Sequence, residues 1–397
     1  MAKYMEDEYE EERPRKKSSS GSKNGKKSSG KQGSGKKSSG KKVSSKKQQA
    51  KKQRRRIIIF IAEIVILVIA VFGLYSAMTV TRGGKMEIKE DDIIINQTVV
   101  EAQETTMKGY RNIALFGVDS TSGALTKNTR SDTIMIASIN QDTGECKLVS
   151  VYRDTYLNLS NDTYNKCNAA YAKGGPEMAI NMLNMNLDMN ITDFVTVGFA
   201  GLTDTVDALG GVWIDVDDAE IKHVNSYQQT MAEDLKRSYT PVSSTGYQLL
   251  NGLQATGYCR VRYTAGDDFK RAERQREVLS AVADQAKKAS LSQLTSTANS
   301  VFEETYTSLD LSEITEMLGN VGNYYISETA GFPQESNRAT GTIGSKGSCV
   351  IPISLEDNVK WLHQFLFNDY DYKPSSTVKE CSEKIYSDTN GYLKKSQ

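Results

Sequence analysis

Apolar residues in this chain form one long run near the start and many short runs after residue 105. The long run covers residues 57–80 and carries a single charged side chain, Glu63. Because a helix rises about 1.5 Å per residue, a run of this length can cross the roughly 30 Å hydrocarbon layer of a membrane. We therefore expect residues 57–80 to form a single transmembrane helix.

The short runs alternate between strand-like and helix-like patterns. β-branched and other apolar residues predict buried strands at residues 112–119, 132–140, 145–154, 193–199 and 212–216. Helical patterns occupy residues 168–187, 201–211, 268–288 and 311–318, and the first of these is broken by Gly174, Gly175 and Pro176. Strands and helices in this order predict an α/β fold with αβα layers around a central mixed β-sheet.

The same patterns divide the chain into parts of different character. We expect a disordered basic tail (1–56), the membrane helix (57–80), a linker (81–104), one folded domain (105–370) and a polar C-terminal tail (371–397). Within the domain, residues 217–245 are polar and are expected to form an excursion over the surface.

Charge is distributed unevenly between these parts. Residues 1–56 hold 20 basic and 6 acidic residues, whereas residues 57–397 hold 30 basic and 43 acidic ones. Basic flanks of a membrane helix stay in the cytoplasm, so we expect the domain to lie outside the cell, anchored to the cytoplasmic membrane. A cleaved signal peptide fits less well because its apolar region is usually only about 7 to 15 residues long. The lysine-rich part of the tail suits anionic lipid headgroups, and since it lacks aromatic residues for stacking, no nucleic-acid partner is expected.

A second concentration of charge lies inside the domain. Residues 258–277 read YCRVRYTAGDDFKRAERQRE and contain five arginines. If residues 258–263 form a strand, Arg260 and Arg262 share a face, and in a following helix Arg271, Arg274 and Gln275 share another. Guanidinium groups match phosphate oxygens in pairs, so this segment predicts a phosphate site. The alternative is a surface helix in which Asp267, Asp268, Glu273 and Glu277 neutralise the arginines.

Two aspartates stand where neighbouring strands meet their loops. Asp119 ends one predicted strand and Asp132 begins the next, so their carboxylates can converge at one edge of the sheet and bind Mg²⁺, or Mn²⁺ in its place. The alternative is turn capping, which is common for aspartate at strand ends. The chain has only two histidines, His223 and His363, which lie 140 residues apart, so neither a Ser-His-Asp triad nor a histidine-based zinc site is expected. The five cysteines allow one disulfide, such as Cys349 to Cys381, without fixing it.

Five sets of segments follow one another along the chain: NIALFGVDS, TRSDTIMIASI, VSVYRDTYLNL with NKCNAAYAKGGPEMAI, VDALGGVWIDV, and LNGLQATGYCRVRY with DDFKRAERQREVL. Taken in order, these segments resemble the LytR-CpsA-Psr family of cell-wall glycopolymer ligases. The resemblance implies a polyprenyl (pyro)phosphate lipid in an apolar tunnel, with its head group on arginines beside a divalent ion. It implies Asp119 and Asp132 as metal ligands, which with Arg153 form the catalytic set. The phosphate-binding residues it implies are Arg130, Arg153, Lys166, Arg260, Arg262, Arg271 and Gln275.

The implied reaction is transfer of a glycopolymer from a polyprenyl-pyrophosphate carrier to peptidoglycan, in a Gram-positive type of cell envelope. Asp119 and Asp132 are the candidates to accept the proton of the attacking hydroxyl, and the alternative is that a metal ion makes this hydroxyl acidic enough without a carboxylate base. A hydrolase of the same lipid, and a non-catalytic lipid sensor or attenuator, remain as alternatives. Which glycopolymer is carried, whether teichoic acid, capsule or another, stays open. The chain departs from the family pattern at Tyr152, where proline is common, and at Lys270, where we expect an added cation near the head group.

Overall fold

The computed structural model describes residues 84–393, except 121–124, 127 and 265. A seven-stranded sheet lies at its centre, in the order β1-β10-β7-β2-β3-β4-β11. Three neighbouring pairs (β1/β10, β7/β2 and β4/β11) are parallel and three (β10/β7, β2/β3 and β3/β4) are antiparallel, so the sheet is mixed, as predicted. Its strands are β1 (Gly84–Lys85), β2 (Tyr110–Val118), β3 (Ser131–Asn140), β4 (Glu145–Val151), β7 (Asp193–Val197), β10 (Thr305–Thr307) and β11 (Tyr325–Phe332).

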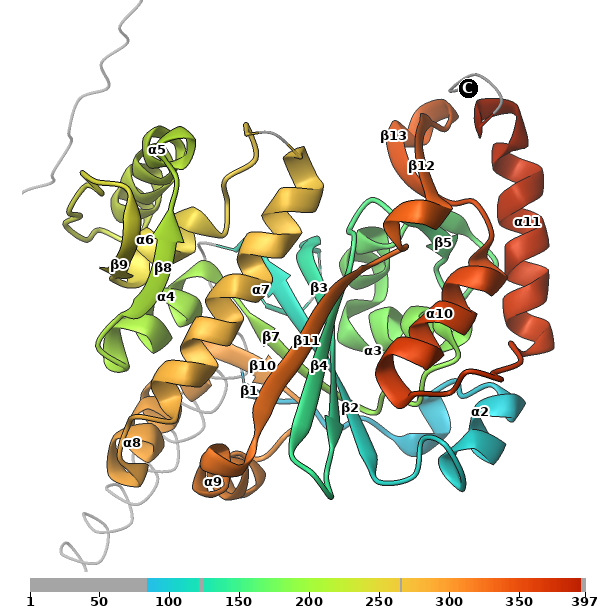
Figure 1. The fold of residues 1–397 in the computed structure, drawn as a ribbon, viewed down its shortest axis with the longest axis horizontal. Coiled ribbons are helices and arrows are strands. Elements are labelled where there is room, and N and C mark those ends of the chain that lie inside the picture. Colours follow the sequence, from blue (N-terminus) through green and yellow to red (C-terminus); the bar gives the residue numbers. More distant parts are fainter. Residues whose placement is uncertain (1–83, 121–124, 127, 265, 394–397) are drawn as a thin grey trace, which may run out of the picture. The chain divides into compact units, whose positions relative to one another are not determined.

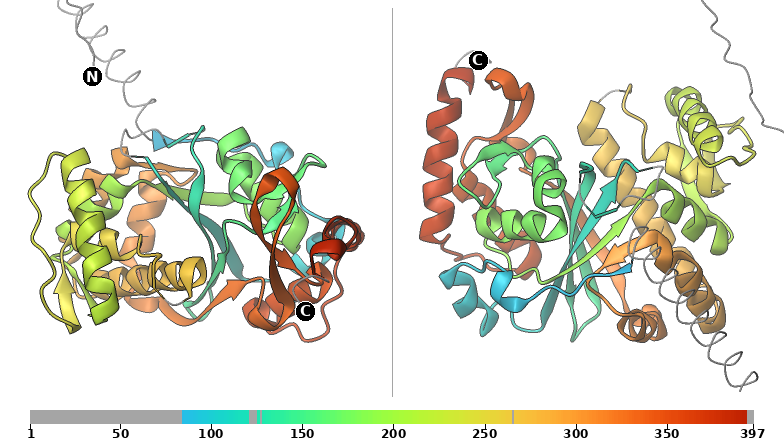
Figure 2. Two further views of the ribbon diagram at one scale, coloured as in Figure 1. Left: turned by 90° about the horizontal axis from the view of Figure 1, so that it is seen from above. Right: turned by 180° about the vertical axis from the view of Figure 1, so that it is seen from behind.

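Helices cover both faces of this sheet, which gives the expected αβα layers (Figure 1). One face carries α2 (Gln97–Gln103), α3 (Asn168–Leu187), α10 (Leu355–Phe367) and α11 (Ser376–Leu393). The other carries α4 (Phe199–Ala208), α7 (Asp267–Ala286), α8 (Leu291–Val301) and α9 (Leu311–Gly319), and the view from behind separates the same two groups (Figure 2).

Three antiparallel strand pairs and two further helices complete the domain. They are β5 (Tyr156–Asn158) with β6 (Tyr164–Lys166), β8 (Val212–Val216) with β9 (Gly246–Leu250), β12 (Arg338–Thr342) with β13 (Ser348–Pro352), α5 (Asp218–Asp234) and α6 (Gly252–Tyr258). The β8–β9 strand pair, α5, which connects its two strands, and α6 pack together with α7 around a second apolar cluster.

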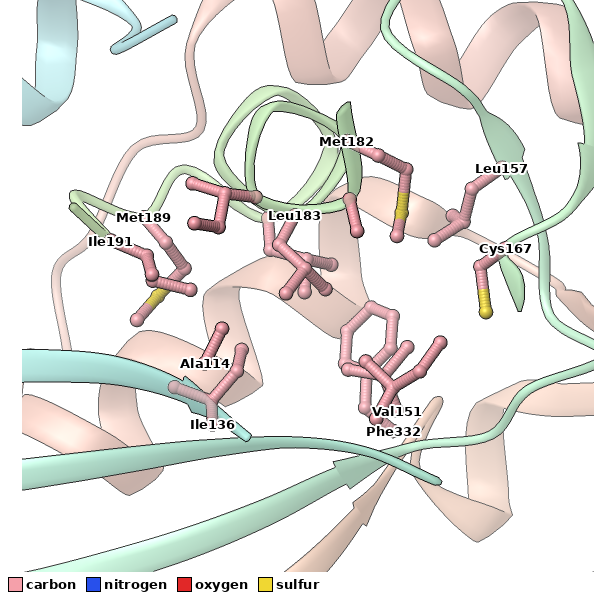
Figure 3. Packing of buried hydrophobic residues seen from close by; sticks show 14 of the residues in the cluster. Ala114, Ile136, Val151, Leu157, Cys167, Met182, Leu183, Met189, Ile191 and Phe332 are labelled. Atoms are coloured by element: carbon pink, nitrogen blue, oxygen red, sulfur yellow. The ribbon is translucent and has the colours of Figure 1, made fainter. Parts of the chain in front are cut away.

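The main core lies between the sheet and α3. Side chains alternate along a strand, so Ala114, Phe116 and Val118 of β2 all face this core and are almost fully buried. Figure 3 shows Met182 and Leu183 of α3 above these strands. This face of the sheet is filled by side chains and anchors the domain.

Helix α3 bends where its sequence predicts. Gly175 has φ +70° and breaks the helical backbone before Pro176. A Cβ atom at Gly175 would lie 2.8 Å from the carbonyl oxygen of Thr126, so both the backbone angle and the close approach require glycine.

The structure corrects three expectations about polar segments. Residues 217–245 are a surface excursion only in part, because α5 buries Val224 and Met231, whereas residues 235–245 form a largely exposed loop. The prediction of a polar C-terminal tail is wrong for the residues of α11, because this helix packs Val378, Cys381 and Ile385 into the main core. The linker is likewise partly folded, since α2 buries Val99. In each case a few apolar residues at helical spacing suffice to dock a largely polar helix.

The predicted membrane span and the basic tail lie outside the described residues. Within residues 84–393, apart from the gaps named above, we find no helix with the length and apolar character needed to span a membrane. All five cysteines are described, and each is a buried free thiol, so Cys349 and Cys381 are not bridged.

Candidate functional site

An elongated cavity of about 390 Å³ lies between the sheet and the helices of the second face. Strands β2, β3 and β7 supply one wall, including Leu115, Met135 and Val195, and α4, α6 and α7 supply the other. Leu115 follows the alternation of β2, because Ala114 and Phe116 point into the main core on the opposite face. The sheet is therefore packed solid on one side and hollow on the other.

Helix α7 forms one side of the cavity along much of its length. Arg271, Gln275, Val278, Leu279 and Val282 all line it, at the spacing of one helical face. At a rise of about 1.5 Å per residue, the stripe from Arg271 to Val282 extends roughly 16 Å. The stripe begins with polar side chains and continues with apolar ones, so the cavity has a polar end and an apolar interior.

Asp119 and Asp132 both line the cavity. The pairing of β2 with β3 explains this, because Val118 lies opposite Ser131 and each aspartate is the next residue in its strand or loop. The structure thus places the two carboxylates at the same edge of the sheet, where the order of the strands predicted them. Asp119 is exposed, whereas the side chain of Asp132 is only 23% exposed.

Asp132 is the centre of an arginine cluster. Its two carboxylate oxygens accept hydrogen bonds from Arg153 Nη1 at 2.8 Å and from Arg262 Nη2 at 3.1 Å. Arg271 Nη2 donates to the backbone oxygen of Asp132 at 3.2 Å. Three arginines from different parts of the chain therefore converge on one residue of β3.

A second carboxylate, that of Asp268 in the first turn of α7, holds the same arginines. Arg153 Nε lies 3.1 Å from it, Arg271 Nη1 3.5 Å and Arg262 Nε 3.6 Å. Burial alone would raise the pKa of Asp268, but the guanidinium groups of Arg271, Arg153 and Arg262 outweigh it and lower that pKa. The sequence pattern indicates Asp268 only as a partner of arginines in a surface helix. The sequence feature that points to its contact with Arg271 is the spacing of three residues, which puts the two side chains on one face of a helix.

Burial and neighbouring charge act in opposite directions on two of these arginines. Burial lowers the pKa of Arg271 to about 10, helped by the positive charge of Arg153 and opposed by Asp268. For Arg153, burial also lowers the pKa, but Asp132 and Asp268 outweigh it and raise the pKa above its usual value. Both side chains remain charged at neutral pH, so the cluster presents guanidinium groups to any ligand entering the cavity.

Lys166 reaches the cluster through Asp154. Its Nζ lies 2.9 Å from Asp154 Oδ1, while Arg153 Nε lies 3.3 Å from Asp154 Oδ2. Asp154 therefore orients Arg153. Lys166 comes from β6, which brings a fourth segment of the chain to this site.

Arg260 and Gln275 line the cavity without joining the arginine cluster. The guanidinium of Arg260 lies over the rings of Phe199 and Tyr227, 4.3 and 5.1 Å from their centroids. Gln275 Nε2 donates to the backbone oxygen of Cys259 at 3.4 Å. The expected strand at residues 258–263 is wrong, because α6 runs to Tyr258 and Cys259 is its C-cap. Arg260 and Arg262 still both line the cavity, on either side of the buried Val261.

Three further basic residues named from the sequence lie outside the arginine cluster. Arg130 is exposed, directly before β3, and forms no ion pair within the described part of the chain. Arg274 is fully buried and pairs with Glu220 at 2.6 Å, so it has a structural role. The expectation for Lys270 is wrong, because its Nζ pairs with Glu273 at 2.7 Å and it lines a different cavity on the other side of α7.

Tyr152, the other departure from the family pattern, braces the start of α7. Its ring packs edge-on against Phe269 with centroids 4.7 Å apart, and its hydroxyl accepts a hydrogen bond from Arg338 at 3.2 Å. Arg338 also lies over the Phe269 ring, 4.0 Å from the centroid. Because Phe269 follows Asp268, these contacts fix the carboxylate that holds the arginines.

A divalent ion would find few protein ligands at this site. Within residues 84–393, outside the named gaps, no group of three or more His, Cys, Asp or Glu side chains is placed to hold a metal. Mg²⁺, however, commonly binds through one or two carboxylates together with substrate phosphates. Asp119 and Asp132 fit that donor set, and Asp119 is the more available because Asp132 already holds two arginines.

Comparison with known proteins identifies the family. The sequence profile of the LytR_cpsA_psr family matches residues 75–343. Biofilm regulatory protein A of Streptococcus mutans is 34% identical over 182 residues, which are 43% of each chain. Polyisoprenyl-teichoic acid–peptidoglycan teichoic acid transferase TagV of Bacillus subtilis is 30% identical over 189 residues, 46% of each chain. The match therefore spans about half the length of these curated relatives.

Solved structures agree with this assignment. The crystal structure of protein gbs0355 from Streptococcus agalactiae superposes with a TM-score of 0.55 and 25% identity, covering 72% of this chain and 97% of that one. It matches the mixed sheet with helices on both faces as a whole. The chain belongs to the LytR_cpsA_psr family.

Proposed function

We propose that this protein is a phosphotransferase that moves a glycopolymer from a polyisoprenyl-pyrophosphate carrier to peptidoglycan. One observation carries the proposal: an apolar cavity about 390 Å³ in volume has, at one end, a cluster of arginines bridged by carboxylates. Apolar side chains along Val278, Leu279 and Val282 suit an isoprenoid tail, and guanidinium groups suit its phosphates. The name of the Bacillus subtilis relative describes this kind of transfer.

The arginines would bind the phosphates by exchanging partners. In the described residues Arg153 and Arg262 are neutralised by Asp132 and Asp268. A pyrophosphate offers more oxygens and more negative charge than either carboxylate, and planar guanidinium groups bind such oxygens in pairs. Phosphoryl transfer is accelerated chiefly by positioning and by stabilising charge, so these residues suffice without a covalent nucleophile.

Asp119 is the best candidate for the proton acceptor. It lines the cavity and is exposed, and no ion pair of its carboxylate occurs in the part of the chain that the structure describes. Asp132, the alternative, already accepts hydrogen bonds from two guanidinium groups, one on each carboxylate oxygen. A hydroxyl of the peptidoglycan glycan would attack the phosphorus joined to the glycopolymer and lose its proton to Asp119. A phosphodiester between peptidoglycan and the glycopolymer would form, and polyisoprenyl phosphate would depart as the leaving group.

Mg²⁺, or Mn²⁺ in its place, would be held by Asp119 and Asp132 together with the substrate phosphates. Such an ion neutralises charge on the transferred group and lowers the pKa of a bound hydroxyl. We further propose that residues 57–80 anchor the protein in the cytoplasmic membrane with residues 1–56 inside, which puts the cavity on the side where peptidoglycan is assembled.

The lipid itself provides the first test. The full-length chain, purified from a bacterial membrane, should carry a polyisoprenyl phosphate or pyrophosphate detectable by mass spectrometry. Replacing both Arg260 and Arg262 by alanine should abolish that lipid. Arg237→Ala is the matched control, because Arg237 is a surface arginine paired with Asp204 away from the cavity. Lipid retained by the double variant would refute the assignment of these residues.

Turnover separates transfer from hydrolysis. With a glycopolymer-loaded polyisoprenyl pyrophosphate, a transferase should form product on added peptidoglycan, and omitting peptidoglycan should stop release of polyisoprenyl phosphate. Equal release without peptidoglycan would identify a hydrolase instead. Asp119→Asn should reduce the rate by about 100-fold or more, the usual contribution of a positioned acid–base group, while leaving the lipid bound.

A further inference from the structure

A second cavity of about 620 Å³, which we call the outer groove, lies between the β8–β9 strand pair and α7. It shares no lining residue with the lipid cavity, because α7 presents a different face to each. Glu273, Glu277 and Asp284 line the outer groove, whereas Arg271, Gln275 and Val278 line the lipid cavity. The proposed function does not use the outer groove.

Two stacked aromatic rings stand at the surface of this groove. Trp213 on β8 and Tyr247 on β9 have centroids 5.3 Å apart and an interplanar angle of 24°. They are 42% and 71% exposed. Both lie on the outward face of the β8–β9 strand pair, since side chains alternate along a strand and Val212 and Ile214, on either side of Trp213, point inward. Single exposed apolar residues are common on proteins, but a stacked pair beside a cavity marks a binding surface.

The polar lining decides what kind of ligand fits. Six carboxylates and three basic side chains line the groove, and although Arg274 neutralises Glu220 and Lys270 pairs with Glu273, the other carboxylates leave it acidic, which disfavours an anionic polymer. Carboxylates accept hydrogen bonds from hydroxyl and amide groups. These lining side chains are Asp215, Asp217, Glu220, Glu273, Glu277 and Asp284, with Lys270, Arg276 and Lys288.

Arg276 adds an unmet donor to this lining. It is 8% exposed, and its Nε donates to Thr329 Oγ1 at 3.3 Å. Its Nη1 is buried and has no hydrogen-bond partner among the residues that the structure describes. Buried polar atoms are nearly always paired, so an oxygen of a ligand in the groove would pair with Nη1 once the Arg276 side chain turned toward the groove.

We propose that the outer groove binds an uncharged saccharide chain, the glycan backbone of the acceptor. The inference deepens the proposed function and rests on it, since that function supplies peptidoglycan as the acceptor. Sugar rings expose apolar C–H faces that stack on aromatic rings, and a rim of hydroxyls that the carboxylates bind. Trp213 and Tyr247 provide the platform, and the acidic walls separate the acceptor glycan from the phosphate-rich donor polymer.

Direct binding can be followed through Trp213. The chain has two tryptophans, and Trp361 lies elsewhere, stacked on Phe365. In a full-length Trp361→Phe variant, a hexamer of N-acetylglucosamine should therefore produce a saturable change in Trp213 fluorescence. A polyglycerol phosphate of similar length should produce none. No saturable change with the hexamer, or an equal one with the polyanion, would overturn the proposal.

Variants test whether the aromatic platform carries the binding. Trp213→Ala combined with Tyr247→Ala should weaken hexamer binding in calorimetry by about tenfold, since each stacked ring contributes a modest share. Tyr247→Phe should bind like the wild type, and Tyr370→Ala is the matched control because Tyr370 is 75% exposed and does not line the groove.

The lipid cavity serves as an internal control. The double variant should keep its polyisoprenyl lipid and its kcat, while its KM for peptidoglycan should rise by about tenfold. An unchanged KM with weakened hexamer binding would place the acceptor elsewhere and refute the inference, leaving the proposed function intact. Failure of the wild-type chain to carry lipid would instead count against the proposed function.

Discussion

Asp132 of β3 and Asp268 of α7 are held together by guanidinium groups that both of them bind. Arg153 bridges them most closely, at 2.8 Å from Asp132 Oδ1 and 3.1 Å from Asp268 Oδ2. Arg262 and Arg271 each contact both carboxylates at 3.1 to 3.9 Å. The bridge fastens α7 to the edge of the sheet at the polar end of the lipid cavity.

Removing the charge of Asp268 should loosen this bridge. In Asp268→Asn the three arginines keep only the carboxylate of Asp132 in common, with Asp154 beside Arg153 alone, and their repulsion should lower the free energy of unfolding by about 1–3 kcal/mol. Inorganic pyrophosphate should restore much of this loss, because its oxygens replace the missing anion. Thermal melts with and without pyrophosphate measure both effects.

The neighbouring residue provides the control for that experiment. Asp267→Asn removes the same charge from the same helical turn, but Asp267 is exposed and forms no ion pair within the described residues, whereas Asp268 contacts three arginines. Its melting temperature should change little and should not depend on pyrophosphate in the same way. Equal behaviour of the two variants would mean that the helix terminus, rather than the arginine bridge, explains the loss.

Blocking the apolar end of the lipid cavity should select ligands by chain length. Val282 lies farthest along the α7 stripe from Arg271. The larger side chain in Val282→Trp fills space that a long isoprenoid needs. The affinity of this variant for a C55 polyisoprenyl pyrophosphate should therefore fall by at least tenfold. Geranyl pyrophosphate, which has ten carbons, should still bind, and Val282→Ala should accept both. Equal loss of long and short lipids would show that the tail does not run along α7.

The buried ion pair of Arg274 with Glu220 should matter for stability. Arg274 Nε and Glu220 Oε1 are 2.6 Å apart, and both side chains are almost fully buried. Arg274→Met leaves a buried carboxylate unpaired, which should cost about 3–5 kcal/mol in urea unfolding. Adding Glu220→Gln should recover most of that cost, because no charge is then buried. A double variant no more stable than Arg274→Met would contradict this account.

His363 should make stability depend on pH. Burial lowers its pKa to about 4, although a hydrogen bond to the backbone of Leu187 and the charges of Asp188 and Asp369 act in the opposite direction. The ring stacks on Tyr372 with centroids 3.5 Å apart. A histidine has a pKa near 6.5 when unfolded, so its contribution is present above about pH 6.5 and is lost as pH falls toward 4.

Two measurements check this prediction. Proton NMR resolves the two histidines of the chain, and the signal that disappears in His363→Gln should titrate near pH 4 in the wild type. Unfolding free energies between pH 4 and 6.5 should rise less steeply in His363→Gln than in the wild type. A normal titration of His363 near pH 6.5 would show that its site is open to water.

The sequence predicted the sheet and the charged residues better than their surroundings. Runs of β-branched and other apolar residues at 112–119 and 132–140 predicted both strands, and the strand order then placed Asp119 and Asp132 at one edge. Composition misled for α5 and α11, because their polar residues outnumber the few that dock them. Such docking depends on tertiary packing, which no local window of sequence contains.

The pairing of arginines was likewise beyond local reasoning. Arg271 and Arg274 are one turn apart on α7, yet Arg271 contacts Asp132 in the lipid cavity while Arg274 is buried against Glu220. Their partners lie on distant segments, so spacing along α7 could not separate a ligand-facing arginine from a structural one. The outer groove was missed for the same reason, since β8, β9 and α7 meet only in the folded chain.

The two faces of the central sheet have different roles: the face packed against α3 stabilises the domain, and the face with the lipid cavity binds ligand. A hollow interior forfeits dispersion contacts that a filled one would make, so the face around α3 has to supply most of the cohesion. Substitutions there should appear as loss of folded protein, whereas those around the hollow should appear as altered ligand preference at nearly normal abundance. The domain can thus change what it carries without redesigning what keeps it folded.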